Sequence, residues 1–167
     1  MWGVMPYPSI QKLFDGMLPP GLQWYWRADF FNELQPGARA KHFEFGSKIP
    51  TPLSQMHLYP ISGAAGRVAK DETAWAYRDA KYAGVIVGVD PDPANAETIT
   101  KWCKDYWEAV HPYSAGGAYL NFIMNEGQDR IKASYKHNYE RLTKIKSKYD
   151  PHNFFSVNQN ILPAEKK

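Results

Sequence analysis

Two stretches in the first half of the chain alternate between hydrophobic and polar residues, and this pattern predicts β-strands. Residues 19–31, PPGLQWYWRADFF, open with a Pro-Gly turn and continue with aromatic residues at a spacing of two. Residues 51–60, TPLSQMHLYP, are bounded by proline. Because side chains alternate between the two faces of a strand, one face of this second strand would carry a polar and aromatic stripe, as a cavity-facing strand does: Leu53, Gln55, His57 and Tyr59.

A buried strand and a well-defined helix follow. The continuous apolar run KYAGVIVGVD, residues 81–90, predicts a strand that is buried on both faces. Asp92 is a suitable N-cap residue, and Pro93 would take the first position of the next helix. The apolar residues of that helix recur at helical spacing and predict its buried face: Ile99, Trp102, Cys103, Tyr106, Trp107 and Val110.

Weaker patterns complete the predicted order of elements. A helix is expected near residues 33–46, the segment TAWAYRD alternates over 73–79, and GGAYLNFIM predicts a short strand over 116–124. Two helices, near 127–136 and 138–149, lead to an extended tail. This order predicts an α+β domain with a mostly antiparallel sheet flanked by helices, followed by a C-terminal helical and extended segment.

Composition and charge narrow the classes of function. A chain of 167 residues suits one domain with a sizeable core. The 20 basic and 17 acidic residues give a net charge of +3, and the basic residues are scattered, so we expect no nucleic-acid partner. No apolar run approaches the length of a membrane span, and the start MWGVMPYPSIQ lacks the regions of a signal peptide. We therefore expect no membrane contact and a cytoplasmic location.

The sequence lacks the spacings typical of metal and nucleotide sites. Cys103 is the single cysteine, which excludes an internal disulfide and a cysteine-based metal site. The five histidines are never spaced as a ligand pair on one helix face, so we expect no metal. His57 lies beside Tyr59 on the candidate cavity-facing strand and is a candidate catalytic group, although a single histidine in a strand is more often a packed or surface residue.

The last third of the chain carries several motifs in a fixed order. A Tyr-x-Asn-aromatic segment, an Asn-Tyr-x-Arg-Leu helix, the run Lys-x-Lys-Tyr-Asp-Pro-x-Asn-x-Phe and a final Asn-Gln-Asn-Ile follow one another over about fifty residues. This pattern resembles the C-terminal module of the berberine bridge enzyme-like (BBE) FAD-linked oxidoreductases, in the vanillyl-alcohol oxidase and p-cresol methylhydroxylase superfamily. The upstream stretches GLQWYW, HLYPISGAAGRV, TAWAYRD and VGVDPDPAN are similar to the substrate domain of bacterial members.

The resemblance implies a division of the chain and a set of cofactor contacts. Residues 1–115 would be part of a substrate-binding domain, and residues 116–167 would be the BBE-like segment that completes it and returns to the flavin domain. Asn and Gln amides can meet both the donors and the acceptors at the polar edge of a flavin without adding charge. Alternatively, the amides of the tail only cap the terminal backbone. The implied FAD contacts are Tyr119, Asn121, Asn158, Gln159 and Asn160.

Phe122 stands where many members of the family carry a tyrosine whose phenol removes the substrate proton. Because a phenylalanine ring cannot accept a proton, the resemblance implies an apolar wall of the substrate pocket at this position. The catalytic base could instead be Tyr119, Tyr59, His57 or a residue outside this chain.

Nothing in the sequence corresponds to the flavin-binding half of the family's enzymes, and two hypotheses follow. The chain is the C-terminal part of an FAD-dependent oxidoreductase that acts on a small organic substrate by hydride transfer to flavin, and it needs an FAD-binding domain in cis or in trans. Alternatively, it is a free-standing, non-catalytic domain that binds a small ligand or self-associates as a homodimer.

Overall fold

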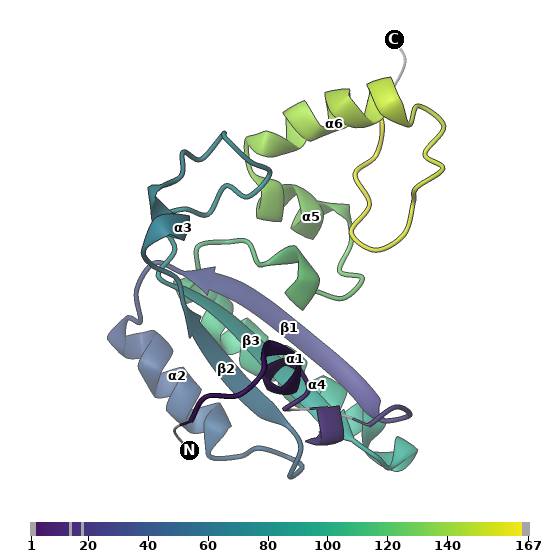
Figure 1. The fold of residues 1–167 in the computed structure, drawn as a ribbon. Coiled ribbons are helices and arrows are strands. Elements are labelled where there is room, and N and C mark those ends of the chain that lie inside the picture. The colour runs from purple at the N-terminus through teal and green to yellow at the C-terminus, as the bar shows by residue number, and fades with distance from the viewer. Residues whose placement is uncertain (1–2, 14, 18, 165–167) are drawn as a thin grey trace.

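The predicted α+β architecture is confirmed. The computed structural model describes residues 3–13, 15–17 and 19–164, so the outermost residues of the predicted division into 1–115 and 116–167 lie outside it. Within this part of the chain, three antiparallel strands form one sheet in the order β1 (Gln23–Phe31), β3 (Tyr82–Asp90) and β2 (Gln55–Pro60). The predicted continuous apolar run is therefore the central strand of the sheet (Figure 1).

Two helices, α2 (Pro36–Gly46) and α4 (Ala96–Val110), pack together beside the sheet, and α4 contacts both β1 and β3. Asp92 caps the 3-10 turn Pro93–Asn95 that precedes α4, because its Oδ1 accepts a hydrogen bond of 2.9 Å from the Ala94 N–H. A Cβ atom on Gly88 would lie 2.8 Å from Cβ of Ile99, so glycine lets α4 approach the central strand closely. The predicted apolar face is buried at Ile99, Trp102, Cys103, Tyr106 and Val110, whereas Trp107, also predicted on this face, is only partly buried.

The remaining elements are short or lie beyond the sheet. Helix α1 (Tyr7–Gln11), a 3-10 turn at Asp15–Met17 and helix α3 (Ala64–Arg67) are brief, as are the 3-10 turns His111–Tyr113 and Leu120–Phe122. Helices α5 (Gln128–Tyr135) and α6 (Asn138–Tyr149) lie beyond one end of the sheet, and the tail returns from α6 toward α5 (Figure 1). In the described part of the chain, no helix has the length and apolar character needed to cross a membrane.

Two predicted strands are wrong. Residues 73–79 and 116–124 are irregular apart from the single turn Leu120–Phe122. The central strand already has a neighbour on each side, so only an outer edge remains for further pairing. At the outer edge of β1, Phe30 exchanges two backbone hydrogen bonds of 2.7 Å with Ala115 and Gly117. Gly116, at a φ of 90°, turns the chain between them, and the contact does not extend into a ladder.

Different elements pack against the two faces of the sheet. Met56, Leu58, Phe31 and Ile86 pack against α4 and form the main core. On the opposite face, Ala28 and Val85 pack against Ala118 and Ile123 of the C-terminal segment, and Phe30 packs against Tyr77. We call this second face the open face, because Tyr59 on it keeps 44% of its surface exposed.

Candidate functional site

His57 and Tyr59 lie side by side on the open face. Their Cα partners on β3 are Val85 and Ala83, whereas Met56 and Leu58 face the core. The alternation predicted for this strand is confirmed from Gln55 onward, but Leu53 lies in the turn before β2 and is not part of the predicted face. The two rings are stacked, with centroids 5.5 Å apart and planes 5° from parallel. The Tyr59 hydroxyl lies 3.3 Å from Nδ1 of His57. The strand therefore holds the imidazole of His57 and the phenol of Tyr59 within hydrogen-bonding distance of each other.

The segment from Ala118 to Ile123 brings three of the predicted site residues to this pair. The side-chain amide of Asn121 donates a 3.0 Å hydrogen bond to the Tyr119 hydroxyl. The ring of Phe122 lies between two phenols, 5.5 Å from the ring of Tyr59 and 5.0 Å from that of Tyr119. His57, Tyr59, Phe122 and Tyr119 therefore form a continuous aromatic row, although the segment that carries two of them is not the predicted strand.

The polar tail returns to the same segment. Gln159 donates from its amide nitrogen to the carbonyls of Ile123, at 2.8 Å, and Met124, at 3.2 Å. The backbone carbonyl of Asn160 accepts a 3.1 Å hydrogen bond from Gln128. Within the described residues, the side-chain amides of Asn158 and Asn160 make no hydrogen bond, and Asn158 has a left-handed φ of 59°. Of the three amides, only that of Gln159 fastens the tail to the described part of the chain.

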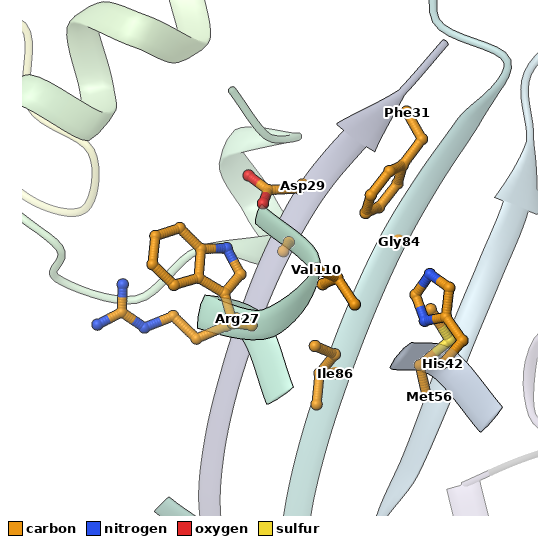
Figure 2. A pocket seen from close by; sticks show the side chains of 10 residues that line it. Arg27, Asp29, Phe31, His42, Met56, Gly84, Ile86 and Val110 are labelled. Carbon is orange, nitrogen blue, oxygen red and sulfur yellow. The ribbon is translucent and has the colours of Figure 1, made fainter. Parts of the chain in front are cut away.

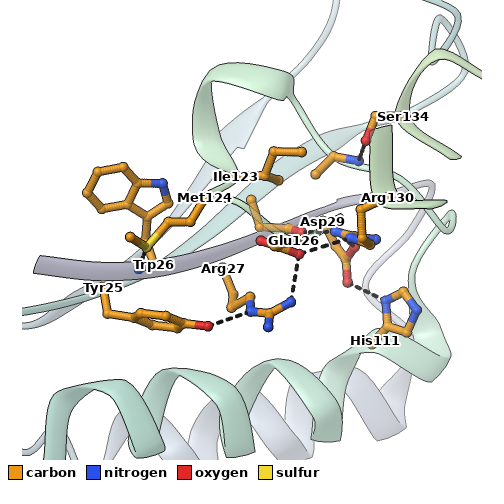
Figure 3. Close-up of polar contacts among 12 residues, drawn as sticks. Tyr25, Trp26, Arg27, Asp29, His111, Ile123, Met124, Glu126, Arg130 and Ser134 are labelled. Atoms are coloured by element: carbon orange, nitrogen blue, oxygen red, sulfur yellow. Dashed lines mark hydrogen bonds and ion pairs between the residues drawn. The ribbon is translucent and has the colours of Figure 1, made fainter. Parts of the chain in front are cut away.

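Glu126 and Arg130, which follow this segment in the chain, belong to a buried charged network on the α4 side of β1 (Figure 3). Glu126 Oε2 accepts from Arg27 at 2.7 Å and from Arg130 at 3.1 Å. Arg130 also donates to Asp29 at 3.1 Å, and Nδ1 of His111 lies 2.7 Å from the second oxygen of Asp29. The side chains of Glu126 and Asp29 are 2% and 1% exposed, so both carboxylates depend on these partners.

Sequence reasoning missed this network. Its signal is the presence of Arg27 and Asp29 at a spacing of two within the aromatic strand WYWRADFF, where both must share one face. Two charges on a strand that packs against a helix need partners, because an unpaired buried charge is costly. The partners lie about one hundred positions further along the chain, and the sequence does not identify them.

A hollow on the α4 side of the sheet is not part of the aromatic row (Figure 2). It would hold about one water molecule and is lined by Arg27, Phe31, His42, Met56 and Ile86 among others. His42 Nδ1 lies 2.9 Å from the Tyr106 hydroxyl, and burial lowers the pKa of the His42 imidazole. This hollow is part of the packing of α2 on the sheet and is too small for an organic ligand.

Cys103 is a packing residue rather than a nucleophile. Its side chain is fully buried between α4 and the sheet, with Sγ 3.4 Å from the Tyr25 carbonyl. Burial raises the pKa of the Cys103 thiol to about 12, and the reactive form of cysteine is the thiolate.

Comparisons with known proteins identify the relatives of this chain. Residues 118–162, which include the C-terminal part of the site, match the family model described as berberine and berberine like. The chain is 29% identical to an FAD-linked oxidoreductase of Dictyostelium discoideum over 97% of this chain and 36% of the relative. It is 33% identical to an FAD-linked oxidoreductase of Bacillus subtilis over 98% of this chain and 42% of the relative. The chain thus spans less than half the length of either relative.

A solved structure shows the same fold. The structure of berberine bridge enzyme-like protein 28 from Arabidopsis thaliana superposes on 87% of this chain and 34% of its own, with a TM-score of 0.74 and 24% sequence identity. The family model and the two oxidoreductases, of which the relative from Bacillus subtilis is 33% identical over 98% of this chain, show that the chain belongs to the berberine bridge enzyme-like family.

Proposed function

We propose that this chain is the substrate-domain part of an FAD-dependent oxidoreductase that takes hydride from a small organic substrate. The observation that carries the proposal is the aromatic row on the open face, which joins residues of β2 to the matched segment 118–162. The relatives are FAD-linked oxidoreductases. Because the chain spans only part of their length, the proposal requires an FAD-binding domain in cis or in trans.

The polar groups around the row suit one edge of a flavin. Asn158 and Asn160 have side-chain amides without a hydrogen-bond partner in the described residues, and Asn121 and Tyr119 lie at the end of the row. These groups would hold the polar edge of the isoalloxazine, since amides and phenols can both donate and accept. Bound there, the flavin would supply the hydride acceptor. Gln159 would act indirectly, by holding the tail against Ile123 and Met124.

The chain's own residues would shape the substrate site. Phe122 has no polar atom in its side chain and packs between Tyr59 and Tyr119, so it would form an apolar wall that excludes water. The Tyr59 hydroxyl, beside His57, would face the substrate from the strand. A pocket with apolar walls and a few fixed polar groups is typical of small-molecule sites.

Replacement of Asn158 and Asn160 by alanine tests the cofactor part of the proposal. In the flavin-loaded enzyme, the double variant should retain well under a tenth of the flavin, because unpaired buried polar groups cost about 1–3 kcal/mol each. The melting temperature of the 167-residue chain should fall only slightly, because neither amide has a partner in the described residues and the one expected cost is that of alanine at the left-handed φ of Asn158. A destabilised chain with normal flavin content would show that these amides only cap the backbone.

An exposed apolar surface on the tail favours a second role for this region. Phe154, Phe155 and Val157 are 81%, 73% and 78% exposed, and Tyr149 on α6 is 74% exposed. Exposed apolar side chains in one region are typical of interaction surfaces. We propose that this surface contacts the flavin-binding domain, with a homodimer as the alternative. A concentration-dependent dimer in light scattering that Phe154→Asp abolishes would favour the homodimer.

A further inference from the structure

The outer edge of β2 has no neighbouring strand. β3 lies on one side of β2, and in the described part of the chain no strand pairs with its other side (Figure 1). The opposite edge of the sheet differs, because the C-terminal segment contacts β1 there at Trp26, Ala28 and Phe30. A free edge offers backbone donors and acceptors to a strand of another molecule.

The backbone groups on this edge follow from the hydrogen bonds on the other side of β2. The Ile61 N–H donates to the Lys81 carbonyl at 2.7 Å, one position beyond the last residue pair of β2 and β3. Because bonded and non-bonded pairs alternate in an antiparallel ladder, every second residue back from Ile61 also points its backbone groups at β3. Met56 and Leu58 therefore each direct an N–H and a carbonyl outward, and Pro60 directs only a carbonyl outward.

β2 lacks most of the features that keep an edge strand from pairing. Edge strands are commonly protected by charged side chains, bulges or prolines. The sequence QMHLYP contains no acidic residue, lysine or arginine, and its proline is the last residue of the strand. The ladder with β3 runs without a bulge. Tyr59 near one end of the strand and Leu53 before the other are 44% and 37% exposed, so the edge is regular, uncharged and flanked by apolar surface.

A second copy of the strand matches this edge in an antiparallel register centred on His57. Each Met56 then pairs with Leu58 of the other copy, and the four outward N–H groups of the two residues meet four carbonyls. In a register centred on Leu58, Pro60 would face Met56 and could not donate to the Met56 carbonyl, because proline has no N–H.

The two ends of the edge also match each other in the register centred on His57. There, Pro60 faces Ser54 of the other copy. Pro60 has no N–H to donate, and the Ser54 N–H already donates to the Thr51 carbonyl at 3.1 Å. The pairing therefore ends at the same point on both copies without leaving an N–H group unpaired.

The side chains that face each other in this register are compatible. Met56 faces Leu58 on the α4 side of the sheet, which forms an apolar pair. Gln55 faces Tyr59 on the open face, where an amide and a hydroxyl can form a hydrogen bond. His57 faces its own copy, and no pair brings two permanently charged side chains together.

We propose that two copies of this chain associate through the outer edges of β2, so that two three-stranded sheets form one six-stranded sheet. His57 lies at the two-fold axis. Facing residues of paired strands share a face of the sheet, so the open faces of both copies lie on the same side. Few residues of each copy take part, and the dimer is therefore reversible. The inference is independent of the proposed function, because it concerns the chain without flavin.

Cross-linking through single introduced cysteines tests the register. Non-hydrogen-bonded facing residues have Cβ atoms about 4.5 Å apart, which is close to the spacing of a disulfide. Under mild oxidation, the His57→Cys variant of the 167-residue chain should therefore form a covalent dimer at least about tenfold faster than Phe43→Cys. Phe43 is an exposed residue of α2 and reports random collisions. The wild-type chain should form none, because Cys103 is buried.

Sedimentation of the chain in a concentration series from about 10 µM to about 1 mM tests the association itself, and the wild type should show a monomer–dimer equilibrium. His57→Lys sets like charges opposite each other and should weaken the dimer at least about tenfold, whereas the neutral His57→Gln should change it less than about threefold. Phe154→Asp alters the tail and should leave the equilibrium unchanged. The urea midpoints of the variants check that each one folds.

Three outcomes overturn the proposal. The first is a wild-type chain that stays monomeric throughout the series, and the second is a His57→Cys variant that cross-links no faster than Phe43→Cys. The third is a dimer that His57→Lys leaves intact and Phe154→Asp abolishes, which assigns the contact to the tail. If the chain is monomeric and the Met56 and Leu58 amides exchange slowly only after a flavin-binding domain is added, the edge belongs to that domain.

Discussion

Replacement of Glu126 by alanine should destabilise the chain more than any change of an exposed charge. Both arginine contacts of Glu126 end on the same oxygen, Oε2, at 2.7 and 3.1 Å, and its side chain is 2% exposed. Loss of one partner from a buried ion pair costs about 3–5 kcal/mol, because the remaining charge stays buried. Arg27 keeps the Tyr25 hydroxyl at 3.0 Å and Arg130 keeps Asp29, so the expected cost is about 3 kcal/mol.

Urea unfolding followed by tryptophan fluorescence measures this cost. Trp107 is a suitable reporter, since the guanidinium groups of Arg27 and Arg130 lie 5.0 and 5.1 Å from its ring centroid. The midpoint should fall while the slope of the transition stays constant, which marks a change in stability rather than in the unfolded state. Glu44→Ala is the matched control: Glu44 pairs with Lys41 at 2.8 Å on the exposed surface of α2 and should change stability by less than about 0.5 kcal/mol.

A double-mutant cycle separates the ion pair from other effects of the substitution. In Arg27→Met the buried cation is gone, so adding Glu126→Ala should cost at least about 1 kcal/mol less than it does alone. A Glu126→Ala variant that loses less than about 1 kcal/mol, or a cycle with no coupling, would refute the reasoning. The carboxylate would then be compensated by solvent rather than by the two arginines.

Three further predictions follow from other parts of the structure. Burial lowers the pKa of His42, so at low pH the unfolded chain binds a proton on this imidazole more readily than the folded chain does. The free energy of unfolding should therefore fall as pH drops below about 6.5, and His42→Phe should flatten this dependence. Asn138→Ala should lower the free energy of unfolding in urea by about 1–3 kcal/mol, since the buried amide of Asn138 donates to the carbonyls of residues 70, 73 and 74. Asn125→Ala, which alters an exposed asparagine, is the control and should leave this free energy unchanged. The 167-residue chain purified alone should be colourless; a flavin absorption band that survives gel filtration would contradict this.

The spacing of apolar residues in the sequence correctly predicted the elements whose side-chain directions follow from helix or strand geometry alone. The helical spacing of α4 places its apolar residues on one face, and a strand periodicity of two places His57 and Tyr59 together, whatever the rest of the chain does. The segment 116–124 has the composition of a strand, yet it became a loop because it meets β1 only around Phe30. Whether an apolar segment forms a ladder depends on a free edge of sufficient length, and the sequence does not show which edges are free.

The candidate site could be predicted as a set of residues but not as an arrangement. The family resemblance predicted Tyr119, Asn121 and Phe122 as site residues, and the alternation of the strand predicted His57 and Tyr59. Only the structure shows that the ring of Phe122 contacts the rings of both Tyr59 and Tyr119. The same holds for the tail, where three amides look equivalent in the sequence. Gln159 differs from the other two because its side-chain amide donates hydrogen bonds to the backbone carbonyls of residues 123 and 124.

The C-terminal segment builds the site by wrapping around the edge strand β1. The outward backbone groups of β1 belong to alternate residues, and the segment contacts three of these residues: Trp26 donates to the sulfur of Met124 at 3.4 Å, the Ala28 carbonyl accepts from Arg130 at 2.8 Å, and Phe30 pairs with residues 115 and 117. An uncovered edge strand is a liability, because its free groups can pair with another chain. Residues 118–123 then lie on the open face, whereas residues 126–130 reach the α4 side. The charges on one face of β1 and the aromatic row on the other are therefore held by a single segment, and the position of Phe122 against Tyr59 depends on contacts at the far side of the strand.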